Sequence, residues 1–294
     1  MIPIGNSKVK DYLSASRNIK RFKSLSVKIL DRLKLISKED LIKEEIFFLE
    51  SIIDYFADKN FFTINPKEAI EILKITPSKK VKDLIYNEFN YEARRRDTFP
   101  KFFNFLGIKT CVYCHAQFAL SFENSEGKFV GLLQADHYNS KDKYPYLSVA
   151  FYNLYPVCGN CNLNKSNIDV EFELYSNKAP EIDLQFKIED KSFIKNFLEF
   201  DKSKLKIEIQ YNEDYISKFY LNEIYKTQTD IVEELVYKSK VYNTTYRENL
   251  KKFDIDDSII DRFIVGNYTL KDDVYKRPLS KMMTDIAIDL DLIK

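Results

Sequence analysis

The stretch that decides the fold is LQADHYNSKDKYPYLSVAFYNLYPVCGNCNLNKSN, Leu133–Asn167. It contains His137, one of only two histidines in 294 residues, directly after an aspartate. A Cys-x-x-Cys pair and a lysine follow within the same stretch. Imidazoles move protons near neutral pH and thiolates ligate metals, so we expect the chemistry of the chain to lie here.

All four cysteines fall into two Cys-x-x-Cys pairs, TCVYCH at Cys111 and Cys114 and VCGNC at Cys158 and Cys161. In a reducing compartment such pairs are the expected ligands of one tetrahedral structural zinc. A thioredoxin-like redox motif is the alternative, but it requires one pair at a helix start rather than two in tandem. With four thiolates available, we expect His115 at the surface or just outside the ligand shell.

The residues between the two cysteine pairs predict strand, loop, strand and helix. A turn signal at 124–127 precedes the apolar run 129–133, which predicts the second arm of a hairpin that ends at Asp136 and His137. The segment 151–157 predicts another short strand, and a helix is expected at about 160–167. A zinc ion would clamp these elements together.

Asp136 and His137 at the strand end and Asn162 in the first helical turn are expected to converge, because these elements pack against each other. The order Asp-His, then Asn, then Cys-x-x-Cys-Asn-x-x-Lys resembles the HNH, or ββα-metal, endonucleases, with the three namesake positions at His137, Asn153 and Asn162. Within that family the stretch is most similar to the zinc-bearing HNH nucleases of bacterial anti-phage defence, such as those of Septu and retron systems. The resemblance covers Cys111–Asn167.

The resemblance implies a role for each residue. His137 would be the general base that deprotonates water, and Asn153 would hold the loop and orient His137. Asp136 and Asn162 would ligate a catalytic Mg²⁺ or Mn²⁺, ions that prefer oxygen ligands. Lys165 would contact a phosphate. The third family position is often His, so the Asn162 form leaves the preferred metal open.

The flanking regions carry no motif. Apolar residues at helical spacing predict helices before residue 109, and alternating patterns predict strands followed by helices after residue 170. The expected fold class is therefore α+β, with a helical region at 1–108, a zinc-clamped HNH core at 109–170 and a mixed strand and helix region at 171–294. The segments that carry this prediction are helices at 41–57, 79–95, 215–253 and 278–293 and strands at 170–176, 182–188 and 205–211.

The overall charge does not indicate a nucleic-acid binder, since 46 Lys and Arg are balanced by 45 Asp and Glu. The local run Arg94, Arg95 and Arg96 is either a solvated helix face, the simpler interpretation, or a contact with nucleic acid. No apolar run is long enough for a signal peptide or a membrane helix, so a cytoplasmic protein is expected.

We therefore expect an HNH endonuclease that cleaves DNA, and the resemblance implies a defence role with an ATPase partner. Two alternatives remain open from the sequence. One is an HNH toxin that cleaves RNA, and the other is a zinc-bearing nucleic-acid binding module without catalysis.

Overall fold

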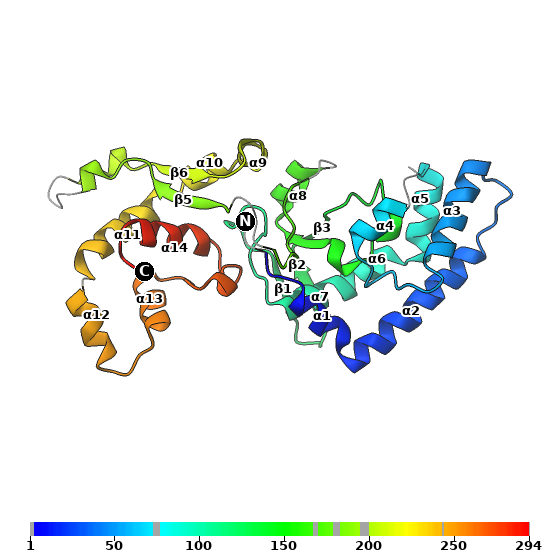
Figure 1. The fold of residues 1–294 in the computed structure, drawn as a ribbon, viewed down its shortest axis with the longest axis horizontal. Coiled ribbons are helices and arrows are strands. Elements are labelled where there is room, and N and C mark those ends of the chain that lie inside the picture. The colour runs from blue at the N-terminus through cyan, green and yellow to red at the C-terminus, as the bar shows by residue number, and fades with distance from the viewer. Residues whose placement is uncertain are drawn as a thin grey trace.

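The computed structural model describes residues 3–72, 77–166, 170–178, 183–194, 200–242 and 244–293. The chain is a mixed α+β protein in which helices dominate and the described strands form three two-stranded sheets. N-terminal helices lie on one side of a central group of short strands, and the C-terminal elements lie on the other side (Figure 1). Within the described residues, no helix has the length and apolarity needed to cross a membrane.

The N-terminal region is helical, as the spacing of apolar residues predicts. Its core is a group of aromatic rings, in which Phe151 of the central segment packs on Phe22, Phe62 and Phe102 at ring-centroid distances of 4.9, 5.9 and 4.5 Å. This packing holds the region against the central strands. The elements are α1 (Ser7–Ser14), α2 (Ser16–Lys34), α3 (Lys43–Tyr55), α4 (Pro66–Ile72), α5 (Lys79–Glu88), α6 (Tyr91–Ala93), a π-helical turn (Arg94–Thr98) and α7 (Phe99–Leu106).

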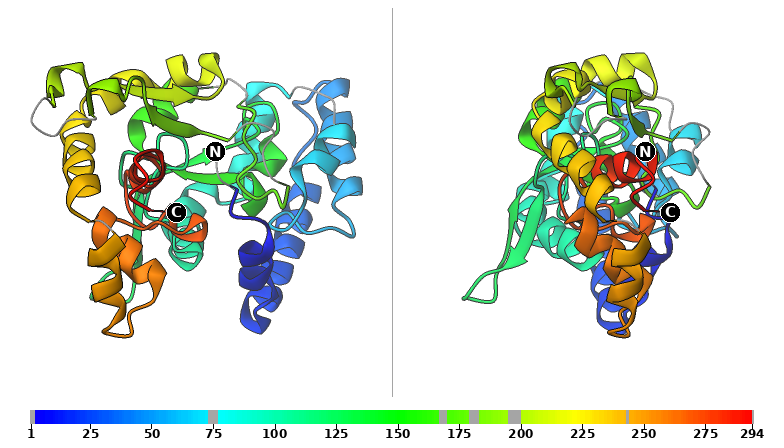
Figure 2. Two further views of the ribbon diagram at one scale, coloured as in Figure 1. Left: turned by 60° about the vertical axis from the view of Figure 1, so that its left-hand side comes forward. Right: turned by 90° about the vertical axis from the view of Figure 1, so that its left-hand side faces the viewer.

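The predicted hairpin is present, but it ends earlier than expected. Strands β1 (Leu120–Glu123) and β2 (Phe129–Leu132) pair antiparallel and extend away from the body of the molecule (Figure 2). The chain bends at Leu133, and Gln134–His137 forms a separate strand, β3. The prediction of one strand running on to His137 was therefore wrong, because β3 pairs with β4 (Leu154–Val157) instead of β1.

Helix α8 (Gly159–Lys165) follows β4 directly and contacts β3. The Cys158 side chain caps it by accepting a hydrogen bond from the Cys161 backbone N–H. The second half of the predicted strand at 151–157 is β4, whereas Phe151–Asn153 is a turn of 3-10 helix. Asn167, where the predicted helix ends, lies outside the described residues. The order β3, β4, α8 is the strand, strand, helix unit that the sequence predicts.

The described residues of the C-terminal region form one two-stranded sheet and several helices. The prediction of a strand at 170–176 was wrong: this segment is a loop. Its alternating pattern arises because Phe172 and Leu174 are buried beside β4, where the Leu174 N–H donates to the Tyr155 hydroxyl. The elements are β5 (Gln185–Ile188), β6 (Ile207–Gln210), α9 (Glu213–Lys218), α10 (Leu221–Lys226), α11 (Thr229–Val241), α12 (Thr244–Lys251), α13 (Asp257–Val265) and α14 (Ser280–Asp289).

Candidate functional site

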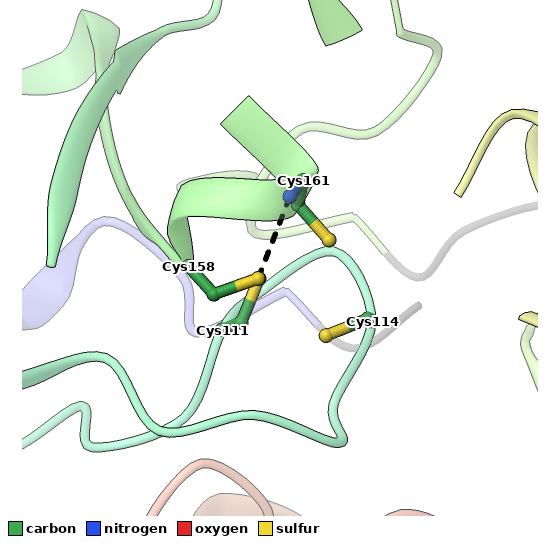
Figure 3. Close-up of side chains that lie close together, drawn as sticks. All are labelled: Cys111, Cys114, Cys158 and Cys161. Atoms are coloured by element: carbon green, nitrogen blue, oxygen red, sulfur yellow. Dashed lines mark hydrogen bonds between the residues drawn. The ribbon is translucent and has the colours of Figure 1, made fainter. Parts of the chain in front are cut away.

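The four cysteines come together at one point. Cys111 and Cys114 lie in the loop before β1, and Cys158 and Cys161 lie at the start of α8 (Figure 3). Their four Sγ atoms all lie within 4.8 Å of one another. A tetrahedral zinc with Zn–S bonds of about 2.3 Å needs sulfur atoms roughly 3.8 Å apart, so the cluster can hold a metal ion such as zinc.

The electrostatics of the cluster also suit a cation. Hydrogen bonds from the Cys111, Cys114 and Cys161 thiols hold the pKa of Cys158 well below its usual range. The cluster therefore favours at least one thiolate, which is the form that ligates metals.

The first cysteine pair is held by the C-terminal region. The Tyr215 hydroxyl donates to the Tyr113 carbonyl at 2.9 Å, and the Tyr225 hydroxyl donates to the Cys114 carbonyl at 2.7 Å. Both tyrosines are buried. The C-terminal helices therefore support the cysteine cluster, a role that the sequence did not indicate.

His115 is not at the surface, so that part of its prediction was wrong. Its side chain is 1% exposed and stacks on Tyr275 with the ring centroids 4.9 Å apart. Burial lowers the pKa of His115 to about 3, which keeps the imidazole neutral. Neither ring nitrogen has a hydrogen-bond partner among the described residues. His115, the residue after Cys114, is thus a buried and neutral aromatic ring.

Asp136 and Lys165 form a buried ion pair between β3 and α8. The Lys165 ammonium lies 3.1 Å from Oδ2 of Asp136 and also donates to the His137 carbonyl at 2.8 Å. The Tyr113 hydroxyl donates to the same Asp136 oxygen at 2.6 Å. The expected surface contact of Lys165 with a phosphate does not follow from this position, because the ammonium is turned inward to Asp136.

The imidazole of His137 is held in one orientation. Its Nε2 lies 3.0 Å from the Ser148 carbonyl, which can only accept, so Nε2 carries the proton and Nδ1 is the basic nitrogen. Burial lowers the pKa of His137 to about 3, so the ring is neutral at physiological pH. Tyr91 packs against the ring with the centroids 5.7 Å apart.

Asn153 holds the loop between β3 and β4. Its side-chain Oδ1 accepts from the Asn139 backbone N–H at 2.8 Å, and its Nδ2 donates to the Asn139 and Leu147 carbonyls at 3.0 and 3.3 Å. The amide is completely buried. Leu147 precedes Ser148, so Asn153 holds the loop segment whose Ser148 carbonyl orients His137. Among the described residues, the Asn153 side chain makes no hydrogen bond to the His137 ring.

Asp136, His137 and Asn162 line one pocket of about 270 Å³. The structure thus brings together the three residues on which the sequence prediction depends. Arg95, a candidate nucleic-acid contact from the sequence, also lines this pocket. The other lining residues were not indicated by the sequence, since they come from a distant helix or from positions without a motif: Tyr91, Gln134, Ala135, Ser140, Lys141, Asp142 and Ser166.

The arginine run is divided between two surroundings. Arg94 is partly buried and its guanidinium lies over the Phe62 ring, 5.7 Å from the centroid. Arg95 and Arg96 are exposed, and Arg95 donates to Gln134 Oε1 at 2.8 Å. Only Arg95 and Arg96 therefore face a possible ligand.

The comparisons with known proteins do not add to this picture: no protein-family model, curated protein or solved structure matches the chain.

Proposed function

We propose that the chain is a metal-dependent HNH endonuclease that hydrolyses phosphodiester bonds in DNA. The observation that carries the proposal is the shared pocket of Asp136, His137 and Asn162, which come from β3 and α8. The adjacent four-cysteine cluster and the β3–β4–α8 order support it, because the same residues in the same order carry the resemblance to HNH nucleases.

In this proposal His137 is the general base. The neutral ring keeps Nδ1 free to accept a proton from water while Nε2 donates to the Ser148 carbonyl. A pKa of about 3 would make a weak base, but it reflects burial in the free protein. A phosphate dianion or monoanion in the pocket would raise that pKa, because a nearby negative charge stabilises the imidazolium.

The oxygen donors of the pocket fit a hard divalent cation. Asp136 offers a carboxylate and Asn162 an amide oxygen, the ligand types that Mg²⁺ and Mn²⁺ prefer. Such an ion, when bound, would polarise the phosphate and stabilise the departing oxyanion. Asp136 retains lone pairs for it, since its Oδ1 has only the Lys165 ammonium at 3.4 Å as a partner among the described residues.

The proposal extends to biology only through the resemblance. The HNH nucleases to which Cys111–Asn167 is most similar act in bacterial anti-phage defence, and we therefore propose the same role, with an ATPase of the same system as the partner.

The test is cleavage of labelled DNA and RNA, single-stranded and duplex, with Mg²⁺ or Mn²⁺, by the wild type and by His137→Ala. We expect divalent-dependent cleavage of DNA by the wild type and a loss of about 10²–10⁴ in rate for His137→Ala. Zinc content and thermal unfolding of the variant serve as folding controls. Cleavage of RNA but not DNA would show that RNA is the substrate. Equal cleavage rates for the wild type and His137→Ala would show that His137 is not the general base.

A further inference from the structure

A second pocket of about 400 Å³ opens beside the first one. The two pockets share Arg95, Gln134 and Ala135, so they adjoin along β3. The second pocket continues from there to Arg96 and to Phe129 on the β1–β2 hairpin. We call the two together the β3 groove. It begins at His137 and ends between the π-helical turn and the hairpin.

The β3 groove carries a small excess of positive charge. Arg96 has no hydrogen bond or ion pair among the described residues, and the side-chain partner of Arg95 is the neutral amide of Gln134. Lys141 also lines the groove, and its ammonium lies 4.5 Å from the centroid of the Tyr91 ring. The carboxylates that line it are Glu92, Asp142 and Asp136, of which the last is already neutralised by Lys165.

Two consecutive arginines of the π-helical turn line the groove. Arg94–Thr98 is wound with one extra residue per turn, an irregularity that is common at functional sites. Arg94 is directed to the Phe62 ring, whereas Arg95 and Arg96 both line the groove. The guanidiniums present forked donors of the kind that bind phosphate oxygens in pairs.

The depth of the catalytic groups restricts what can enter. Asp136 and His137 are each only 6% exposed, so a scissile phosphate must descend into the 270 Å³ pocket to reach them. The phosphates of a duplex lie along a stiff double helix, so lowering one of them between the walls of this pocket requires the duplex to bend or open, at a cost in free energy. A single strand can turn its backbone inward, and positively charged grooves with an aromatic contact are typical of single-strand binding.

We propose that the β3 groove binds a single strand of nucleic acid. The scissile phosphate lies at His137 and neighbouring phosphates lie on Arg95 and Arg96, with Phe129 as the partly exposed aromatic contact. Because Gln134 is neutral, an anionic phosphate can replace it as the hydrogen-bond acceptor of the Arg95 guanidinium. This inference rests on the proposed nuclease function, and it assigns the substrate class to which that function applies.

The test is binding of labelled oligonucleotides to His137→Ala protein, which separates binding from cleavage. Single-stranded DNA, single-stranded RNA of the same sequence and a DNA duplex are compared by fluorescence anisotropy at several salt concentrations. We expect either single strand to bind at least about tenfold more tightly than the duplex. The DNA and RNA arms identify the sugar that the groove accepts.

Two further proteins carry a second change in addition to His137→Ala. One adds Arg95→Ala/Arg96→Ala, and the matched control adds Arg17→Ala, at an exposed arginine on α2 that lines neither pocket. We expect the double variant to lose affinity at least about tenfold at low salt and to lower the log–log salt slope by about 1.4, or 0.7 for each lost single-strand phosphate contact. Arg17→Ala should keep both values. A duplex that binds as tightly as a single strand, or an unchanged slope in the double variant, would overturn the inference.

Cleavage by the full chain distinguishes this inference from the function on which it rests. If single strands bind in a way that depends on Arg95 and Arg96 but the wild type cleaves nothing, the nuclease function is wrong and single-strand binding in the β3 groove stands. If duplex and single strands are cleaved at the same rate, and Arg95→Ala/Arg96→Ala does not change that rate, single-strand binding in the β3 groove is wrong and the nuclease function stands.

Discussion

The ammonium of Lys165 lies 3.1 Å from the carboxylate of Asp136, although these side chains are only 2% and 8% exposed. Both charged groups are therefore desolvated. The Asp136 carboxylate also accepts a hydrogen bond from the Tyr113 hydroxyl, and the Lys165 ammonium also donates one to the His137 carbonyl. Burying two charges is costly unless each is paired and hydrogen-bonded, as these are. The carboxylate proposed to bind a divalent cation thus already has a resident positive charge, and the two cations must share it.

Removing the ammonium should reveal this relationship. In Lys165→Met, Asp136 becomes an uncompensated buried carboxylate, so we expect the free energy of unfolding to fall by about 3–5 kcal/mol. Millimolar Mg²⁺ or Mn²⁺ should restore part of that loss, because the ion replaces the ammonium at the same carboxylate. Chemical unfolding with and without the ion measures both effects.

Two controls separate this effect from general damage. Lys67→Met removes an exposed ion pair with Glu173 and should change stability by no more than about 1 kcal/mol. Lys165→Met/Asp136→Asn removes both buried charges and should be more stable than Lys165→Met alone. If Lys165→Met unfolds like the wild type, or if divalent ions stabilise both proteins equally, the two cations do not compete for Asp136.

The cysteine cluster predicts one tightly bound zinc per chain. Cys158→Ser should lose the metal and unfold at lower temperature, because a structural zinc contributes folding free energy directly. Metal analysis and thermal unfolding provide the measurements. Asn160→Ala is the matched control, since Asn160 is exposed between Cys158 and Cys161 and should keep both metal and stability. Wild-type protein purified without chelator and free of zinc would contradict the prediction.

The four-cysteine cluster could be predicted from the sequence because its members are close in sequence within each pair. Two Cys-x-x-Cys pairs leave few arrangements other than one shared ion. The strand, strand, helix order around His137 followed for the same reason, since each element is short and bounded by turn residues.

The parts that could not be predicted depend on contacts between distant segments. Lys165 was expected at a phosphate because its position on α8 relative to Asn162 does not reveal that Asp136 lies under it. The support of the first cysteine pair by Tyr215 and Tyr225 joins residues about a hundred positions apart, and no local pattern marks it. The division of Arg94 from Arg95 and Arg96 depends on Phe62, which lies about thirty positions earlier in the chain and gives the Arg94 guanidinium its partner.

Asn153 should matter for stability as well as for the geometry of His137. Asn153→Ala leaves the Asn139 backbone N–H and carbonyl without their side-chain partner, and each unsatisfied buried group costs about 1–3 kcal/mol. We therefore expect a loss of at least about 2 kcal/mol in chemical unfolding, together with weaker cleavage. Asn104→Ala on the exposed face of α7 is the control. An Asn153→Ala protein as stable as that control would show that the loop is held without the amide.

The sharpest prediction separates the proposed base from the proposed ligands. Asp136→Asn and Asn162→Ala weaken the oxygen set that would hold the divalent ion, so their cleavage should fall and then recover in part as Mn²⁺ is raised. His137→Ala removes the proton acceptor, and additional Mn²⁺ cannot replace it. Exogenous imidazole can enter the cavity left by the ring and should restore some activity to His137→Ala alone. Rates measured against Mn²⁺ and against imidazole, with zinc content checked in every variant, give a two-way test. Recovery of His137→Ala by Mn²⁺, or of Asn162→Ala by imidazole, would show that the roles assigned to these residues are wrong.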